Sequence, residues 1–286
     1  MVRYNVDLND KVVLVTGANS GTGKWTAIEL AKMGARLVIL CRDSFRGEEA
    51  LKDIKKISGS RNIELMICDL ASLDSIREFC SLFKSKYKRL DVLINNAGVI
   101  LPARHETEDG YELQFGVNHL GHFLLTNLLL DLIIKSAPAR IVVVASGGHK
   151  TGKIHFEDIN LEKNFNMAKA YSQSKLANVL FTYELARRLK DKSVSVNALH
   201  PGPVASNIAV NRDTGFGKLI TGFLKPFFQT PKKGAETAIY LASSKDLEGV
   251  TGKYYYKKKQ APSSKLTHDK DLAKKLWDIS EAMVEL

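Results

Sequence analysis

VVLVTGANSGTG, residues 12–23, joins a short apolar run to a glycine-rich turn, and a helical pattern of apolar residues follows it directly. A short continuous apolar run is typical of a buried strand, so the stretch predicts a strand, a tight turn and a helix. Glycine lacks a Cβ and lets backbone N–H groups approach a ligand, and the amino end of a helix attracts anions. We therefore expect a dinucleotide pyrophosphate to bind Gly17, Asn19, Ser20, Gly21, Thr22 and Gly23.

Further apolar runs alternate with helical patterns along the chain. The expected strands cover residues 36–41, 64–68, 92–95, 141–144 and 194–198, and the expected helices cover 23–33, 47–57, 72–87, 110–135, 168–190 and 234–242. Strands that alternate with helices are typical of a parallel sheet. The pattern predicts one α/β domain over residues 1–286, a Rossmann-type doubly wound parallel sheet of about seven strands with helices on both faces.

The composition is that of an ordinary globular chain. Of 286 residues, 44% are hydrophobic and 26% are charged, and 42 Lys and Arg against 31 Asp and Glu leave a net charge of +11. Apart from residues 257–259, the basic residues are scattered among acidic ones as on a solvated surface, so we expect no nucleic-acid partner. Cys41, Cys68 and Cys80 lack CxxC spacing and indicate neither a disulfide framework nor a zinc site.

No targeting or membrane-spanning segment is expected. The amino-terminal sequence MVRYNVDLNDK has no apolar core, and polar residues or glycine interrupt the longer apolar runs. A signal peptide or a membrane span needs a longer uninterrupted apolar run. We therefore expect no membrane span and a cytoplasmic protein.

The composition changes after the Pro-Gly-Pro sequence at residues 201–203. Residues 205–231 are rich in Gly, Asn and Phe, and their apolar positions fit a short amphipathic helix that either covers an apolar substrate site as a lid or fills the core. The apolar positions are Phe216, Leu219, Ile220, Phe223, Leu224, Phe227 and Phe228. In the tail, residues 257–286, the spacing of Leu272, Leu276 and Trp277 suggests one docking helix.

The end of the second expected strand bears on the choice of nucleotide. About twenty residues after such a glycine turn, an NAD-binding chain places Asp or Glu to accept hydrogen bonds from the ribose 2′-OH. This chain has Cys41, Arg42 and Asp43 there. A guanidinium binds a 2′-phosphate with two parallel hydrogen bonds, so Arg42 favours NADP(H) over NAD(H). A small shift of the backbone would instead offer Asp43 to a 2′-OH.

Two segments of the second half carry residues suited to acid–base chemistry. Tyr171 and Lys175 stand four residues apart on one face of the helix expected at 168–190. A nearby fixed cation lowers the pKa of a phenol, so we expect Lys175 to lower that of Tyr171, which would be the general acid in reduction and the general base in oxidation. Ser146 follows the strand at 141–144, and its hydroxyl would donate to a carbonyl oxygen as negative charge develops.

Together these motifs resemble the short-chain dehydrogenases/reductases over residues 8–255, with the G-x-x-x-G-x-G turn, an Asn-Asn-Ala-Gly sequence at 95–98 and Y-x-x-x-K. The resemblance implies that Asp69 and Leu70 contact the adenine and that Lys175 holds the nicotinamide ribose. It further assigns to the cofactor site Asn96, Ala97, Gly98, Pro201 and Val204, along with Tyr171. In the family the Asn that matches Asn118 holds a helix kink and a water that relays protons to the lysine. The implied catalytic set is Asn118, Ser146, Tyr171 and Lys175.

Within this family, residues 41–43, 116–126, 171–178 and 200–204 are most similar to the retinol dehydrogenase-like branch. That branch acts on retinoids and other lipophilic carbonyl compounds and alcohols. Thr22 departs from its pattern, because an apolar residue is usual there. Many members of the family pair the helices that carry Asn118 and Tyr171 with a second subunit, which makes a homodimer or homotetramer an open expectation.

Other interpretations of the same residues stay open. The scaffold equally serves oxoacyl reductases and reductases of carbon–carbon double bonds, and a chain that senses NADP without turnover would keep the same cofactor motifs. His119, His122 and His149 lack the carboxylates of a metal site, so we expect no metal. The first two are expected to pack within a helix, and His149 to line the substrate pocket.

Overall fold

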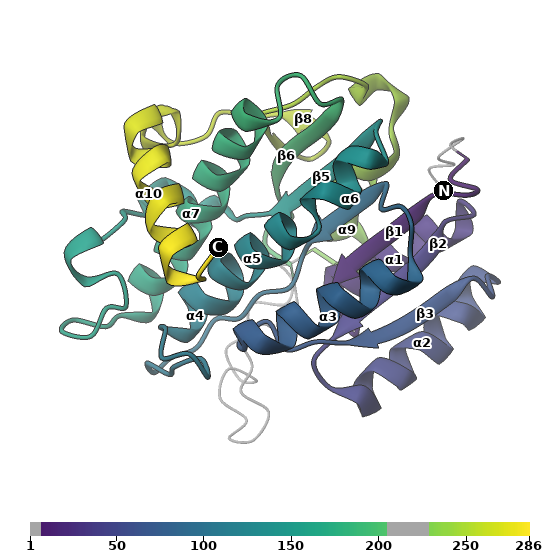
Figure 1. Ribbon diagram of the computed structural model, residues 1–286, viewed down its shortest axis with the longest axis horizontal. Helices are drawn as coiled ribbons and strands as arrows, with labels where there is room; N and C mark the ends of the chain where they lie inside the picture. Colours follow the sequence, from purple (N-terminus) through teal and green to yellow (C-terminus); the bar gives the residue numbers. More distant parts are fainter. Residues whose placement is uncertain (1–6, 205–228) are drawn as a thin grey trace.

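Eight strands form one sheet in the computed structural model, which describes residues 7–204 and 229–286. The strand order is β3-β2-β1-β4-β5-β6-β7-β8 (Figure 1). The strands are β1 (Val12–Thr16), β2 (Arg36–Cys41), β3 (Ile63–Ile67), β4 (Val92–Asn95), β5 (Ala139–Val144), β6 (Val194–His200), β7 (Lys253–Tyr256) and β8 (Lys259–Gln260). The first seven run parallel, and β8 pairs antiparallel with β7. The predicted doubly wound sheet is confirmed. The eighth strand, β8, was not predicted, because its two residues are too few to show a hydrophobic pattern.

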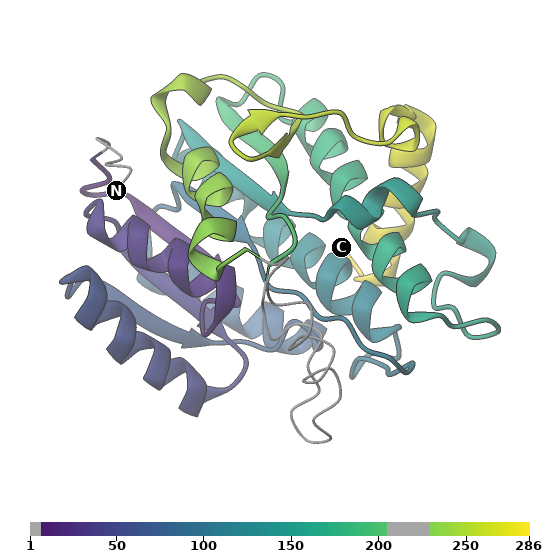
Figure 2. The ribbon, with the colours of Figure 1, turned by 180° about the vertical axis from the view of Figure 1, so that it is seen from behind.

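Helices cover both faces of the sheet. They are α1 (Gly21–Lys32), α2 (Ser44–Ser58), α3 (Leu73–Lys86), α4 (Leu113–Phe115), α5 (Gly121–Leu128), α6 (Leu130–Lys135), α7 (Met167–Arg188), α9 (Pro231–Ser243) and α10 (Lys270–Met283). Figure 1 shows α3, α5 and α7 in front of the sheet. Figure 2, the view from the opposite side, shows α1, α2 and α9 covering the other face. Residues of the predicted lid from 205 to 228, including its apolar positions, lie outside the described residues.

The two larger hydrophobic cores of the described residues lie on the two sides of the sheet, because successive residues of a strand point to opposite faces. Val13 and Val15 of β1 pack in the core under α1, α2 and α9. Val12 and Leu14 pack in the core under α3, α5 and α7. Every residue of β1 is buried, so its position in the centre of the sheet follows from its continuous apolar run.

The helical stretch predicted over residues 110–135 is present from residue 113, but it is divided into several elements. These are α4, a π-helical turn at Gly116–Leu120, α5 and α6. In the π-helical turn the Gly121 N–H donates to the carbonyl of Gly116, five residues earlier. A Cβ on Gly121 would lie 2.5 Å from the carbonyl oxygen of Leu70, so the helix passes very close to the loop after β3. Such turns are frequent at functional sites, and a hydrophobic pattern alone does not show them.

The docking helix predicted for the tail is confirmed by α10, which lies beside α7 in Figure 1. The buried Trp277 ring stacks on Phe181 of α7 with the ring centroids 5.8 Å apart. It meets Phe123 of α5 edge-to-face, with the centroids 4.8 Å apart. The faces of α5 and α7 around these aromatic side chains are therefore covered by the chain's own carboxyl-terminal segment.

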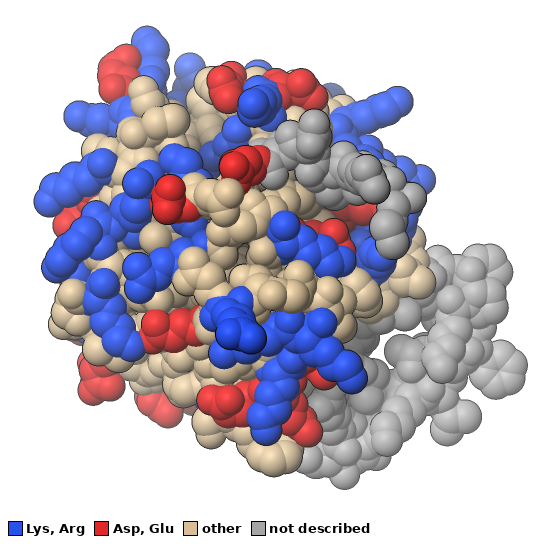
Figure 3. Space-filling model, turned by 90° about the vertical axis from the view of Figure 1, so that its right-hand side faces the viewer, with Lys and Arg blue, Asp and Glu red and all other residues tan. Residues whose placement is uncertain are grey.

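The surface shown in Figure 3 has Lys and Arg side chains spread over it, with Asp and Glu among them. This agrees with the scattered charge pattern of the sequence. Across residues 7–204 and 229–286, the structure has no helix that combines the length and apolarity needed to cross a membrane.

Candidate active site

The predicted site residues gather where the parallel strands end. In a doubly wound sheet the chain passes to opposite faces after two adjacent strands, and the crevice that opens at their carboxyl ends is the usual ligand site. Here β1 and β4 are those adjacent strands, with α1 behind β1 and α5 in front of β4. The glycine turn follows β1, Arg42 follows β2, Asp69 follows β3 and Ser146 follows β5.

The glycine turn has the backbone conformation that phosphate binding requires. Gly17 and Gly21 have φ angles of +65° and +58°, which residues with a Cβ rarely adopt. Ser20 is the N-cap of α1, yet its side chain makes no capping hydrogen bond. The first N–H groups of α1 are therefore left without a side-chain acceptor, and a pyrophosphate would satisfy them. Asn19 and Ser20 are half-buried in the turn.

Thr16, which was not predicted as a site residue, organises this edge of the sheet. Its buried hydroxyl accepts the N–H groups of Asn96 and Ala97, both at 2.9 Å, and lies 2.9 Å from His122 Nε2. The Asn96 side chain donates to the Thr16 carbonyl at 2.8 Å and accepts from the Thr22 hydroxyl at 3.1 Å. The Asn96 side chain thus holds the glycine turn in place. The hydrogen bond from the Thr22 hydroxyl to Asn96 explains why a polar residue stands at position 22. The polar end of an apolar strand was the only sequence signal for Thr16.

Arg42 is exposed at the end of β2 and forms a long ion pair. Its side chain is 64% exposed, and the nearest carboxylate is that of Asp69, 3.8 Å from Nε. The Asp43 carboxylate is the N-cap of α2 and accepts from the Arg46 N–H at 2.8 Å, which opposes the alternative that Asp43 serves a ribose 2′-OH. The Asp69 carboxylate accepts from the Ala71 N–H at 2.9 Å and remains half-exposed beside Arg42.

The other residues assigned to the cofactor by resemblance border the same edge. Leu70 is buried beneath Gly121, and Gly98 is half-buried. Pro201 and Val204 follow β6, and both are half-buried. A Cβ on Gly234 would lie 2.5 Å from Val204 Cγ2 and 2.9 Å from Thr22 Cγ2, so Val204 lies close to the glycine turn.

Asn118 lies in the π-helical turn and is fully buried. Its side-chain oxygen accepts from the Val99 N–H at 2.7 Å, and its Nδ2 donates to the Val99 carbonyl and to the Ser174 hydroxyl, both at 3.0 Å. The Asn118 carbonyl accepts from His122 Nδ1 at 3.1 Å. Because Nδ1 carries the proton there, Nε2 of the neutral ring accepts from Thr16. Asn118 therefore connects the helix of Tyr171 with the network of Thr16.

Ser146 and Tyr171 face each other across Gly148. A Cβ on Gly148 would lie 3.5 Å from the Tyr171 ring and 3.6 Å from the Ser146 hydroxyl. Burial raises the pKa of Tyr171, and a hydrogen bond from Ser146 opposes the rise. The predicted lowering of this pKa by Lys175 is wrong for the structure: the phenol is protonated near neutral pH, which is the form that a general acid needs.

Lys175 lies on α7, four residues after Tyr171, and its side chain is buried. Its Nζ is 5.8 Å from the centroid of the Tyr171 ring. Nζ donates to the Val144 carbonyl at 3.1 Å, and Asn178 donates to the same oxygen at 3.3 Å. Burial lowers the pKa of Lys175 to about 8, because a charged group loses hydration there. The ammonium is consequently in equilibrium with the amine close to physiological pH.

His149, which the sequence predicts to line the substrate pocket, makes two hydrogen bonds to the backbone in the structure. Its ring is buried, with Nδ1 donating to the Ser146 carbonyl at 2.6 Å and Nε2 accepting from the Ser264 N–H at 3.2 Å. It thereby holds the backbone of Ser146. His119 packs against Phe115 as predicted. The residues that the structure describes contain no group of three His, Cys, Asp or Glu side chains arranged to hold a metal ion.

Known proteins resemble this chain in sequence. A family model described as short chain dehydrogenase matches residues 11–215. Retinol dehydrogenase 14 of Homo sapiens is 48% identical over 296 aligned residues, which cover 98% of this chain and 88% of that protein. Retinol dehydrogenase 12 of Mus musculus is 45% identical over 276 residues, covering 96% and 87% of the two chains.

Solved structures agree with the sequence relatives. An uncharacterized protein from Mycobacterium Paratuberculosis has a TM-score of 0.78 and 33% identity, with 98% of this chain and 96% of that chain covered. A short chain dehydrogenase from Escherichia coli CFT073, solved in complex with NADPH, has a TM-score of 0.68 at 23% identity over 88% of this chain and 98% of that chain, and shares the fold. The chain belongs to the short-chain dehydrogenase family, in the branch that contains the retinol dehydrogenases.

Proposed function

We propose that this protein is an NADP(H)-dependent oxidoreductase that interconverts a carbonyl and an alcohol on a lipophilic small molecule. The observation that carries the proposal is the placement of Ser146, Tyr171 and Lys175 around one edge of the sheet that also holds an uncapped glycine turn. A phenol, a hydroxyl and a buried amine beside a dinucleotide site are suited to moving one proton while a hydride is transferred.

The chain's own residues would manage the proton. A bound NADPH supplies the hydride. Tyr171, protonated near neutral pH, donates its proton to the carbonyl oxygen of the substrate. The Ser146 hydroxyl donates a hydrogen bond to the same oxygen as charge develops. Lys175 in its ammonium form would stabilise the phenolate that remains, and Asn118 keeps the helix of Tyr171 tied to the π-helical turn.

Replacing Tyr171 with Phe tests the chemistry, because it removes only the proton donor. We expect Tyr171→Phe to abolish NADPH oxidation with all-trans-retinal and with simple aromatic aldehydes, while NADPH binding followed by fluorescence is retained. Tyr183→Phe is the matched control, since Tyr183 is on the same helix and its hydroxyl meets Ser263 instead of the site. Turnover by Tyr171→Phe at the wild-type rate would refute the assignment. Turnover of oxoacyl compounds or enones in place of aldehydes would move the proposal to those reductases.

The preference for NADP(H) is supported by the exposed guanidinium of Arg42 and by the engagement of Asp43 in capping α2. A charge-assisted pair of hydrogen bonds to a 2′-phosphate contributes about 1.5–3 kcal/mol, so Arg42→Ala should weaken NADPH binding by about 10- to 100-fold. NADH binding should change little, because NADH has no 2′-phosphate. Arg61→Ala, an exposed Arg before the amino end of β3, is the matched control. An equal loss for both nucleotides would refute the role of Arg42.

Two relatives named as retinol dehydrogenases support the lipophilic substrate class. The test is a panel of aldehydes and ketones of increasing apolar size, assayed with NADPH and with NADH. We expect kcat/KM to rise with apolar area, since each buried CH₂ contributes about 0.8 kcal/mol. A preference for short polar carbonyl compounds would contradict this substrate class.

A further inference from the structure

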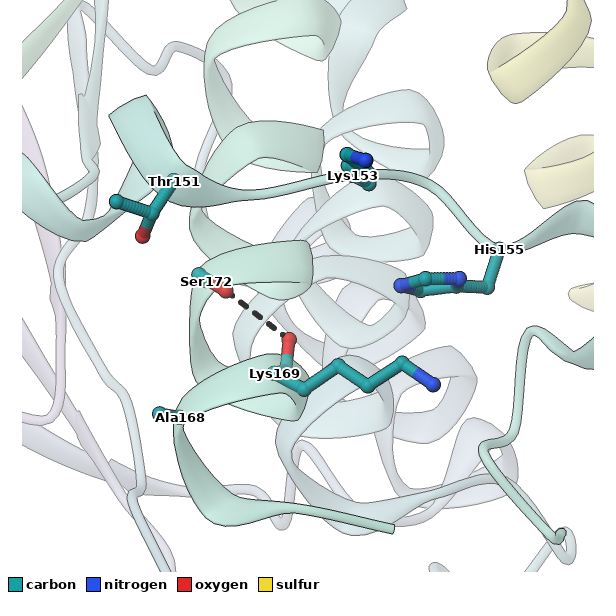
Figure 4. Close-up of a pocket in the computed structure, with 6 residues that line it drawn as sticks. All are labelled: Thr151, Lys153, His155, Ala168, Lys169 and Ser172. Atoms are coloured by element: carbon teal, nitrogen blue, oxygen red, sulfur yellow. Dashed lines mark hydrogen bonds between the residues drawn. The ribbon is translucent and has the colours of Figure 1, made fainter. Parts of the chain in front are cut away.

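A cavity of about 370 Å³ lies between the segment that follows β5 and the first turns of α7. Its lining residues are Thr151, Lys153, His155, Ala168, Lys169 and Ser172. Figure 4 shows Thr151, Lys153 and His155 on the segment and the other three on the helix, with the Lys169 side chain extending toward the side of His155. The volume is at the lower end of the range for small-molecule sites.

The walls of the cavity are fixed by contacts behind them. The His155 N–H donates to the Gln173 side-chain oxygen at 2.9 Å, and the Thr151 hydroxyl donates to the Gly148 carbonyl at 3.1 Å. A Cβ on Gly152 would lie only 2.4 Å from the Ser172 carbonyl oxygen, so the segment passes close to the helix there. The cavity is consequently a feature of the packed fold.

Positive charge converges on this cavity without a carboxylate in its lining. Lys153 and Lys169 form no ion pair with any residue that the structure describes. Burial lowers the pKa of His155, the two ammonium groups lower it further, and only Asp158 opposes them. The Thr151 and Ser172 hydroxyls already donate to the carbonyls of Gly148 and Lys169, so the donors left for a ligand are the two unpaired ammonium groups and the imidazole, which suit an anion with several oxygen atoms.

We propose that this cavity is an anion site that binds a phosphate group, either of a soluble phosphate compound or of a phospholipid headgroup. A phosphate has up to two negative charges and three acceptor oxygens, which match two ammonium groups and an imidazole better than a carboxylate does. The site is adjacent to the reaction centre, because Ser172 directly follows Tyr171, but none of its lining residues takes part in the proposed chemistry. The proposal stands independently of the proposed function, and its test measures binding instead of turnover.

The test compares two double variants of the full chain that each remove two positive charges. Lys153→Ala/Lys169→Ala alters the cavity, and Lys190→Ala/Lys192→Ala alters exposed lysines just beyond the other end of α7. Calorimetric titration with inorganic phosphate at constant ionic strength should show saturable binding by the wild-type chain. The cavity variant should bind about tenfold or more weakly, and the control variant should bind like the wild type. Equal binding by both variants would place the phosphate elsewhere, the glycine turn included, and would overturn the proposal.

A second arm identifies the source of the phosphate. Vesicles of phosphatidylcholine with and without phosphatidic acid are sedimented with each variant. Retention that needs phosphatidic acid and is lost only in the cavity variant assigns a headgroup; phosphate binding without such retention assigns a soluble compound. A third measurement needs no variant that might misfold: phosphate should raise the pKa of His155 in the histidine ring NMR spectrum of the wild-type chain. An unchanged His155 titration at saturating phosphate would overturn the proposal.

Discussion

Thr16→Val removes one buried hydroxyl and keeps the shape of the side chain nearly unchanged. In the structure that hydroxyl accepts from the N–H groups of Asn96 and Ala97 and donates to His122 Nε2. The substitution leaves two backbone donors and one ring acceptor without their partner. We expect both stability and cofactor affinity to fall, because these contacts hold the loop after β4 against the glycine turn.

The magnitude follows from the exposure of the groups left unpaired. An unsatisfied buried donor or acceptor costs about 1–3 kcal/mol. His122 is fully buried, whereas Asn96 and Ala97 are half-buried, so water can recover part of the loss at the two N–H groups. The sum is about 3 kcal/mol of unfolding free energy, near the lower end of the range for three groups.

Thr26→Val is the matched control. Thr26 is as buried as Thr16, but its hydroxyl has no hydrogen-bond partner among residues 7–204 and 229–286. Its replacement should change the unfolding free energy by less than about 0.5 kcal/mol or should stabilise the chain. Urea unfolding followed by circular dichroism measures both variants, and NADPH titration measures the effect on the turn. If Thr16→Val costs no more than Thr26→Val, the hydroxyl does not organise this edge.

Two further predictions concern α10 and the buried lysine. Trp277→Ala should lower the unfolding free energy by about 3–5 kcal/mol, because the ring is buried against Phe123 and Phe181, whereas Lys274→Ala on the exposed face of α10 should change it little; thermal and urea unfolding measure both. The folded pKa of Lys175, about 8, lies below its ordinary value of 10.5, so the unfolded chain binds more protons between these pH values and stability should rise with pH there. Lys175→Met should remove a slope of about 1.4 kcal/mol per pH unit from urea unfolding measured across this range, and identical slopes in the two proteins would contradict the lowered pKa.

Local patterns predicted much of this molecule. The apolar run of β1, the glycine turn and the start of α1 are contiguous, so their conformations follow from propensities and from the absence of a Cβ. The Tyr171–Lys175 pair was found for the same reason, since residues four apart in a helix share a face. The helical spacing of Leu272, Leu276 and Trp277 predicted the helix of the tail, α10.

Contacts between distant segments decided the rest. Thr16 and His122 are 106 residues apart in the chain, and no periodicity shows that they meet. The π-helical turn depends on the close approach of Gly121 to Leu70, and the role of His149 depends on Ser264. The sequence predicted a lowered pKa for Tyr171, whereas burial raises it. Residue spacing shows that a cation is near but does not show how deeply a phenol is buried. The sequence alone determined which residues are available for chemistry at the edge of the sheet. Burial and hydrogen bonding in the tertiary structure decided which of them hold the site and in which protonation state.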